Sequence, residues 1–295
     1  MKPSQRNRYA AHIEKAVAHL AARLESGTAP DLSELSAAAG LSEYHFHRVF
    51  RLMTGETLAS VVQRLRLAIS LPALASEGAT IAAATADGAY STTQSYARAL
   101  KARAGISPAQ ARAQPAEIAR LQEQLRRPRM EATASMAPPL DIEIVSFEPL
   151  SIVALRNVGD YRELYGAYAQ LFSRLPDPAA VTGLYGIPYD DPRDTDAQHC
   201  RFDCGVSLAD IAAAKRASTL REVRIDGGTC ARLRHTGSYD LIWSHLDLLY
   251  AEVMNDSALQ LGPAPAWIHY LDDPDEVAEA NRRADLYLPI IAEKA

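Results

Sequence analysis

Cysteine, tryptophan and long apolar runs are scarce in this sequence. Its 295 residues include three cysteines and two tryptophans. An odd number of cysteines in a chain of this size disfavours a disulfide framework. No stretch approaches the roughly 18 uninterrupted apolar residues of a membrane span, and the first residues lack the apolar segment of a signal peptide. We therefore expect a cytoplasmic protein.

The composition is that of an ordinary folded protein. Apolar residues make up 48% of the chain and charged residues 23%, which excludes the disordered and fibrous classes. The length exceeds that of one average domain and fits two, each large enough to bury its own core.

Charge is unevenly distributed along the chain, although the net charge is only −5. Residues 1–113 contain 13 Lys and Arg against 8 Asp and Glu, residues 114–138 contain 4 against 3, and residues 139–295 contain 14 against 25. The corresponding charges are +5, +1 and −11. A basic front half suits a polyanion such as DNA, which would repel the acidic back half.

Prolines and changes of periodicity divide the chain. An amphipathic helix over residues 9–24 opens a helical front half. Residues 114–138 hold a short amphipathic helix between prolines and are interpreted as a linker. Alternating, Val- and Ile-rich segments after it predict strands, among them DIEIVSF, REVRID and ADLYLPII. Two strand-turn-helix stretches, at NVGDY and HTGSYD, indicate an internal duplication of this α+β half.

The front half contains a helix-turn-helix pattern. Gly40 marks a tight turn between two short helices, and Ser42 is a candidate N-cap for the second. On that second helix an apolar stripe comprises Phe46, Val49, Phe50 and Met53. The opposite, polar stripe comprises Tyr44, His47, Arg48 and Arg51. Such a stripe on one helix face is what reading of the DNA major groove requires.

The pattern recurs about fifty residues later. TIAAATADGAYSTTQSYARALKARAGISP predicts a short helix, a turn at Gly88 and Ala89, and a helix from about Ser91. Its inward residues are Tyr96, Ala99 and Leu100, and its outward polar residues are Thr93, Gln94, Ser95 and Arg98. An apolar helix between the two units would fix their separation, which suggests that they read successive major grooves.

Residues 5 to 113 resemble the AraC-type DNA-binding domain, which carries two such units. The resemblance rests on AGLSEYHFHRVFRLMTG in the first unit and on scattered matches in the second, including Tyr96, Arg98 and Gly105. Ala89 departs from the family, which has glycine at that turn position. The resemblance implies that Tyr44, His47 and Arg48 read one groove, and that Thr93, Gln94, Ser95 and Arg98 read the next.

Residues 139 to 295 resemble the GyrI-like domain, a duplicated α+β module that binds small molecules. The motifs are YGIPYDDP, RFDCGVSL, GSYDLIWSHLDLLY, WIHYLDDPDE and DLYLPI, in that order. Aromatic residues near the expected strands suggest an aromatic ligand pocket. Candidate ligand-binding residues are Tyr161, Tyr185, Trp243, Trp267, Ile268, Tyr270 and Asp285.

Relatives that bind lipophilic cations carry a glutamate on the penultimate strand, where this sequence has Ile268. The nearest acid is Asp285 on the last strand, where the family pattern also has one. Because a buried carboxylate must be paired, Asp285 either bonds internally or meets a ligand donor or cation. A neutral aromatic ligand is the alternative to a cationic one.

An enzyme and a metal-binding protein are the other interpretations of the back half. Cys230 with His235, or His199 with Cys200 and Cys204, could form a nucleophile pair or part of a metal site. Their spacing fits no catalytic or zinc signature, so we expect no enzyme, cofactor or metal.

The combined expectation is an all-α tandem helix-turn-helix domain (1–113), a linker (114–138) and an α+β GyrI-like domain (139–295). It implies a transcription regulator with double-stranded DNA, RNA polymerase and a small-molecule effector as partners. The alternative is a protein that sequesters a small molecule, or a GyrI-like hydrolase, with incidental DNA binding.

Overall fold

The computed structural model describes residues 5–76, 78, 80–127, 141–211 and 220–292. Contacts group the chain into two compact units. The helical unit comprises Ala10–Gly40 and Met53–Ala132, and the sheet unit comprises Met1–Tyr9, Leu41–Leu52 and Thr133–Ala295. Most of the second helix of the first helix-turn-helix pattern thus belongs, by its contacts, to the sheet unit. The part of the expected linker over residues 128–138 lies outside the described residues.

The front half is helical, as expected. The predicted architecture of the chain, with two helix-turn-helix patterns before an α+β half, is confirmed. In chain order the helices are α1 (Gln5–Glu25), α2 (Leu32–Ala39), α3 (Glu43–Thr54), α4 (Leu58–Ala75), α5 (Ile81–Asp87), α6 (Thr93–Ala104), α7 (Pro108–Ala113) and α8 (Pro115–Arg126).

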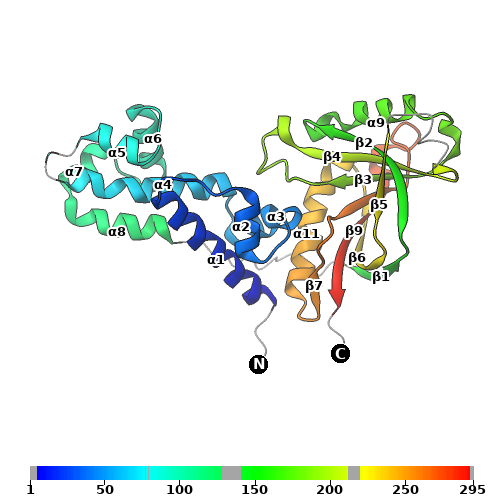
Figure 1. The fold of residues 1–295 in the computed structure, drawn as a ribbon, viewed down its shortest axis with the longest axis horizontal. Coiled ribbons are helices and arrows are strands. Elements are labelled where there is room, and N and C mark those ends of the chain that lie inside the picture. The colour runs from blue at the N-terminus through cyan, green and yellow to red at the C-terminus, as the bar shows by residue number, and fades with distance from the viewer. Residues whose placement is uncertain (1–4, 77, 79, 128–140, 212–219, 293–295) are drawn as a thin grey trace. The chain divides into compact units, whose positions relative to one another are not determined.

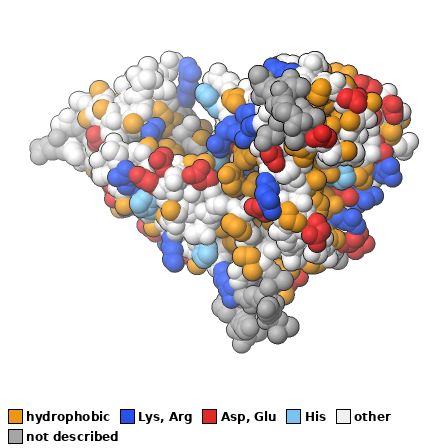
Figure 2. All heavy atoms as spheres, turned by 45° about the vertical axis from the view of Figure 1, so that its right-hand side comes forward, with side chains coloured by type: hydrophobic (Ala, Val, Ile, Leu, Met, Phe, Trp, Pro, Cys, Tyr) orange, Lys and Arg blue, Asp and Glu red, His pale blue; other side chains and the backbone are white. Residues whose placement is uncertain are grey.

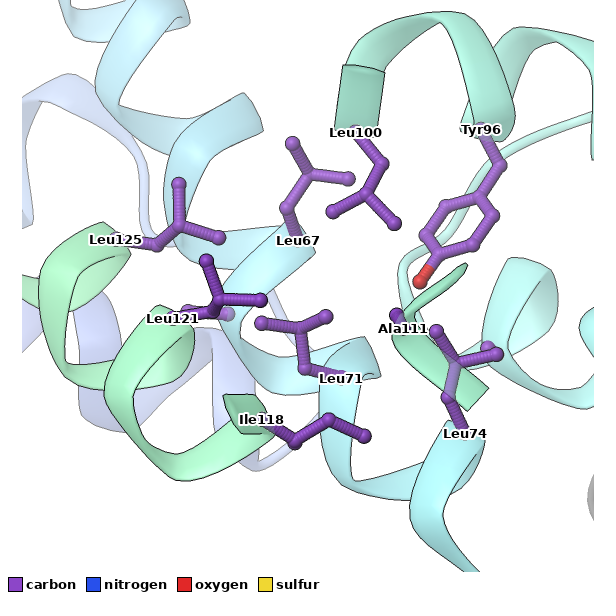
Figure 3. Close-up of a cluster of buried hydrophobic side chains, with 11 residues drawn as sticks. Leu67, Leu71, Leu74, Tyr96, Leu100, Ala111, Ile118, Leu121 and Leu125 are labelled. Carbon is purple, nitrogen blue, oxygen red and sulfur yellow. The ribbon is translucent and has the colours of Figure 1, made fainter. Parts of the chain in front are cut away.

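Helix α4 is the centre of the helical unit, with α5, α6, α7 and α8 packed against it (Figure 1). Leu67, Leu71 and Leu74 of α4 meet Leu100 of α6 in one buried cluster (Figure 3). Three residues of α8 complete it: Ile118, Leu121 and Leu125. By length and composition α4 could cross a membrane, but these fully buried leucines make it a core helix.

Two turns show how the sequence ends and restarts the helices. Gly40 adopts φ 62°, a left-handed conformation that glycine allows without strain, and closes α2. In the second pattern Gly88 has φ −78° and Ala89 adopts φ 53° instead. A left-handed alanine is strained because its Cβ crowds the backbone. The second turn therefore forms at some cost where the AraC-type pattern has glycine.

The back half alternates strands with helices and short 3-10 turns. Its elements are β1 (Glu143–Phe147), β2 (Leu150–Val158), η1 (Tyr161–Glu163), α9 (Leu164–Ser173), η2 (Pro178–Ala180), β3 (Val181–Pro188), η3 (Ala197–His199), β4 (Arg201–Leu208), β5 (Arg221–Ile225), β6 (Gly228–Thr236), η4 (Tyr239–Leu241), α11 (Ile242–Asn255), β7 (Leu259–Leu261), β8 (Trp267–Tyr270), η5 (Glu279–Asn281) and β9 (Arg283–Ala292).

The sheet itself shows the predicted duplication. Its strands pair antiparallel in the order β1-β6-β9-β8-β3-β4-β2-β5, with β7 added to β9. Read from either end, this order runs through equivalent strands, because β1, β6, β9 and β8 repeat the roles of β5, β2, β4 and β3. Corresponding pairs also share their register: Arg156 faces Asp203 in the first repeat, and Arg234 faces Asp285 in the second.

The two faces of the sheet have different neighbours. Helix α9 packs against β2 and β4, and α11 packs against β6, β7 and β9. Side chains on the other face form an aromatic and aliphatic cluster around Trp267 and Tyr287. On the surface of the sheet unit drawn in Figure 2, basic and acidic side chains lie next to one another. That pattern is typical of paired charges.

Candidate functional site

The polar stripe of α3 is only partly open to solvent. Its apolar stripe is buried as predicted, with Phe46 and Val49 fully inaccessible. Tyr44 is 40% exposed, whereas Arg48 retains only 5% of its accessible surface. A DNA-contacting arginine was expected to be exposed, so its burial requires an explanation.

Arg48 is buried because it belongs to an ion-pair cluster within the sheet unit. Arg48 Nη1 donates to the Asp247 carboxylate, and also to the Trp243 carbonyl oxygen at 3.2 Å. Arg51 Nη2 donates to both Asp247 carboxylate oxygens, at 2.9 and 3.0 Å, and to Asp191 Oδ2 at 3.0 Å. Both predicted DNA-contacting arginines of α3 are thus held by carboxylates. Helix α3 lies beside α11 in Figure 1.

A third arginine completes the cluster. Arg193 donates from Nε to Asp191 Oδ1 at 2.8 Å and from Nη1 to Asp247 Oδ2 at 2.6 Å. Burial opposes ionisation of Asp191, but hydrogen bonds from Arg193 and the charge of Arg48 outweigh it and hold the carboxyl pKa well below its usual range. The same groups lower the pKa of Asp247 in spite of its burial. Both carboxylates are therefore ionised at neutral pH.

His45 adds a neutral anchor on α3. Its Nε2 lies 2.9 Å from the Gly262 carbonyl oxygen and its Nδ1 lies 2.7 Å from the Tyr250 hydroxyl. Since the carbonyl can only accept, Nε2 carries the proton and Nδ1 accepts from Tyr250. Burial lowers the pKa of His45 to about 4, so the ring is neutral at physiological pH.

Sequence reasoning did not single out His45, Asp191 or Asp247. His45 falls between the apolar and polar stripes of α3, and Asp247 is an acid in a helix that is otherwise largely apolar. Periodicity alone does not reveal that residues about 200 positions apart meet.

Helix α6 presents the second predicted stripe differently. Its inward residues Tyr96 and Leu100 are fully buried. Thr93, Gln94 and Arg98 are exposed. Ser95 is half-buried, and its hydroxyl donates to the Thr92 carbonyl oxygen at 2.8 Å as part of the helix cap. Ser95 is thus engaged locally, while the other predicted residues of α6 face solvent.

The sheet face opposite the helices carries a stack of aromatic rings. Trp267 and Tyr287 are parallel, with centroids 3.8 Å apart and planes at 6°. Phe147 packs on Trp267 at 4.6 Å, and Tyr185 stacks on His269 at 4.6 Å and 10°. Such offset and stacked rings form a rigid aromatic surface.

Each of the two buried aspartates on this face is already paired. Asp285 receives hydrogen bonds from Nε and Nη2 of Arg234. Asp203, at the equivalent position of the other repeat, is bound by Arg156, Arg221 and the Tyr189 hydroxyl. The internal pairing that the sequence left open for Asp285 is the arrangement observed.

The structure separates the predicted ligand-binding residues into two groups. Trp267, Tyr185 and Asp285 share the aromatic face. Ile268 and Tyr270 point to the opposite face, because side chains alternate along a strand. The rings of Trp243 and Tyr161 pack together with centroids 5.0 Å apart and planes at 32°, and Tyr161 packs edge-on against Phe202. Trp243, Tyr270 and Trp267 therefore do not enclose one pocket.

A cavity of about 160 Å³ opens beside the aromatic stack. Three aromatic residues line it, Tyr44, Tyr189 and Trp267, together with aliphatic side chains such as Ile187 and Val223. An apolar cavity of about 150 Å³ accommodates a single benzene ring. The cavity is thus of a size that fits one aromatic ring, and its lining also includes Arg224 and Asp226, which form an ion pair with each other.

The cysteines offer no activated nucleophile. Burial raises the pKa of the Cys200 thiol to about 11, and burial likewise raises those of Cys204 and Cys230 to about 12 and 11. Cys230 and His235 lie five residues apart on β6, so their side chains point to opposite faces. Among the described residues no group of three or more His, Cys, Asp or Glu is placed to hold a metal ion.

Comparison with known families agrees with both sequence predictions. The GyrI-like small molecule binding domain matches residues 140–291, more than half of the chain, and a helix-turn-helix domain matches residues 35–114. The probable transcriptional regulator YgiV of Escherichia coli (strain K12) is 23% identical over 155 residues, which cover 51% of this chain and 96% of that relative.

The chain also matches parts of solved structures at low identity. The cryo-EM structure of the EcmrR–DNA complex in EcmrR-RPo matches with a TM-score of 0.44 and 12% identity, covering 65% of this chain and 75% of that one. A hydrolase from Listeria innocua matches with a TM-score of 0.37 and 16% identity, covering 53% of this chain and 94% of that one.

Proposed function

Since the chain belongs to the GyrI-like small molecule binding family and carries an AraC-type helix-turn-helix region before that domain, we propose that it is a DNA-binding transcription regulator controlled by a small molecule. Residues 1–113 would bind DNA, 114–138 would link the domains, and 139–295 would bind the effector. RNA polymerase is the expected protein partner, and the cytoplasm the expected location.

DNA would be contacted through α3 and α6. The proposed groups are Tyr44, His47, Arg48 and Arg51 on α3, and Thr93, Gln94, Ser95 and Arg98 on α6. The exposed stripe of α6 supports this assignment, because base edges are read by side chains that project freely from one helix face. Selection of bound sequences from random duplexes tests it, and a failure to enrich any sequence would contradict it.

The effector is proposed to be a neutral aromatic molecule. The observation that carries this choice is that Asp203 and Asp285 are both buried and both paired with arginines. Among the described residues, a cation on the aromatic face would find no unpaired buried carboxylate. The cavity beside Trp267 offers aromatic and aliphatic contacts, and the Asp226 carboxylate in its lining is paired with Arg224. Apolar pockets with few free charges favour uncharged ligands, because burial of an unpaired charge is costly.

Tryptophan fluorescence can test this proposal, because the chain has only two tryptophans. Trp243→Phe leaves Trp267 as the single reporter at the cavity, and Trp267→Phe leaves Trp243, which does not line the cavity, as a control. Neutral, cationic and anionic compounds of one aromatic scaffold would be titrated into both variants. Saturable quenching of Trp267 by the neutral compound is expected, and a preference for the cation would contradict the proposal.

Regulation is distinguished from mere sequestration by measuring DNA affinity with and without the bound compound. A regulator should show a ligand-dependent change in affinity for its selected sequence. Equal affinity in both conditions would favour sequestration. Loss of the compound into products would instead reveal a hydrolase.

A further inference from the structure

The ion-pair cluster around α3 engages the arginine side chains that would contact DNA. Two of the predicted DNA-contacting residues of α3, Arg48 and Arg51, donate through their Nη atoms to Asp247. Their side chains are 6% and 17% exposed, and Asp191 is 3% exposed. One Nη atom of each arginine is engaged by a carboxylate, and burial of both side chains keeps their other donors from a phosphate or a guanine.

Carboxylate and phosphate are alternative partners for the same arginine donors. Both present two anionic oxygens that match the planar guanidinium fork. The carboxylates of Asp191 and Asp247, which we call the carboxylate latch, therefore place on α3 the kind of charge that DNA would place there. Arg193 also binds both carboxylates and keeps them oriented.

We propose that the carboxylate latch autoinhibits DNA binding, so that α3 contacts DNA only after Arg48 and Arg51 exchange Asp247 and Asp191 for nucleic-acid phosphates or bases. This inference rests on the proposed function and names its regulation. The acidic back half then acts on DNA binding by competing for the cations of the front half. The −11 charge of residues 139–295 includes the groups that compete.

The cavity supplies a route by which an effector acts on the latched helix. Tyr44 lines the cavity and packs edge-on against Tyr189 at 5.6 Å. Tyr44 and Arg48 are four residues apart, so they share one face of α3. A molecule in the cavity contacts Tyr44, one turn before Arg48. If it binds more tightly to one of the two states of α3, latched or released, it shifts the equilibrium towards that state.

The test compares full-length chains carrying Asp247→Asn, Asp247→Glu and Asp240→Asn. Asparagine keeps the shape of Asp247 but removes its charge, and glutamate retains the charge. Asp240 is exposed in η4, so Asp240→Asn matches the charge change away from the latch. Fluorescence anisotropy with a labelled mixed-sequence duplex measures affinity, and hydrogen exchange over residues 43–52 measures release of α3.

Asp247→Asn is expected to bind the duplex about tenfold more tightly than the unmodified chain, with faster exchange over residues 43–52. Asp240→Asn and Asp247→Glu should bind as the unmodified chain does. Equal gains from Asp247→Asn and Asp240→Asn would reduce the effect to net charge and overturn the latch. Unchanged affinity of Asp247→Asn would overturn it too, while leaving DNA binding intact. Absence of DNA binding by every folded chain would refute the proposed function itself.

Discussion

Helices α3 and α6 carry the same kind of polar stripe in different surroundings. Arg98 of α6 is exposed and has no ion-pair partner in the described part of the chain. Arg48, at the equivalent position of α3, is 5% exposed and bound by Asp247. Both helices bury the apolar stripe that their periodicity predicts, so the difference lies in what covers the polar side.

The comparison shows that a helix stripe has two separable properties. Its chemistry follows from local sequence, since 3.6-residue periodicity decides which side chains share a face. Its availability depends on residues about 200 positions away, which local sequence does not specify. In this protein one of the two helices proposed to read DNA is open, while the other is held by carboxylates.

The largest expected effect concerns the packing of α6 in the core of the helical unit. Leu100 is fully buried in the cluster around Leu67 and Leu71. Leu100→Ala should lower the free energy of unfolding of the helical unit by about 2–5 kcal/mol, because it leaves a cavity. Urea unfolding followed by circular dichroism measures this. Leu100→Met should cost below about 1.5 kcal/mol, and similar losses for the two variants would contradict the packing described.

The next effect is confined to α3 and depends on pH. His45 has a pKa of about 4 in the folded protein, against about 6.5 when unfolded. The unfolded or released helix therefore takes up the proton first as pH falls. The contribution of neutral His45 to the free energy of unfolding is complete above about pH 6.5. It declines as the pH falls towards 4, by on the order of 3 kcal/mol in total.

Hydrogen exchange as a function of pH measures this loss region by region. Protection factors over residues 43–52, which correct for the slower intrinsic exchange at low pH, should fall between about pH 6.5 and 4, whereas those of α6, which contains no histidine, should not share that dependence. His45→Asn removes the titrating ring and should flatten the response. A slope that persists in this variant would assign the effect to another group.

A smaller effect separates the two arginines in DNA binding. Arg98→Ala should weaken binding to a selected sequence by about 1–3 kcal/mol, the usual worth of a base contact. Arg48→Ala should cost less in net affinity, because it removes a DNA contact and also one arm of the latch. Arg112→Ala, an exposed arginine on α7, is the charge-matched control. Equal losses for Arg48→Ala and Arg98→Ala would argue that α3 is not restrained.

The smallest effect tests the strained turn before α6. Ala89 is exposed and has φ 53°, a conformation that costs an alanine about 1 kcal/mol. Ala89→Gly should therefore raise the melting temperature of the helical unit. Ala86→Gly, three residues earlier inside α5, should lower it, because glycine weakens a helix interior. A loss of stability in Ala89→Gly would show that the left-handed turn is not the source of strain.

Much of the fold could be predicted from sequence. Gly40, the apolar stripe of α3 and the inward residues of α6 lie as their spacing indicated. The repeated strand-turn-helix stretches appear as a sheet whose two halves share register. The ligand-binding set was less accessible to prediction, because local sequence does not show that Trp243, on α11, and Trp267, on β8, lie on opposite sides of the sheet.

The sequence by itself determined the local chemistry: two helix-turn-helix patterns, a basic front, an acidic back and a duplicated α+β half. These properties depend on periodicity and composition over short windows. Tertiary structure alone decided that Arg48 meets Asp247 and that Asp285 is neutralised by Arg234. Such pairings join residues far apart in the chain, and whether a charge is free or engaged depends on which groups the fold brings within hydrogen-bonding distance of it.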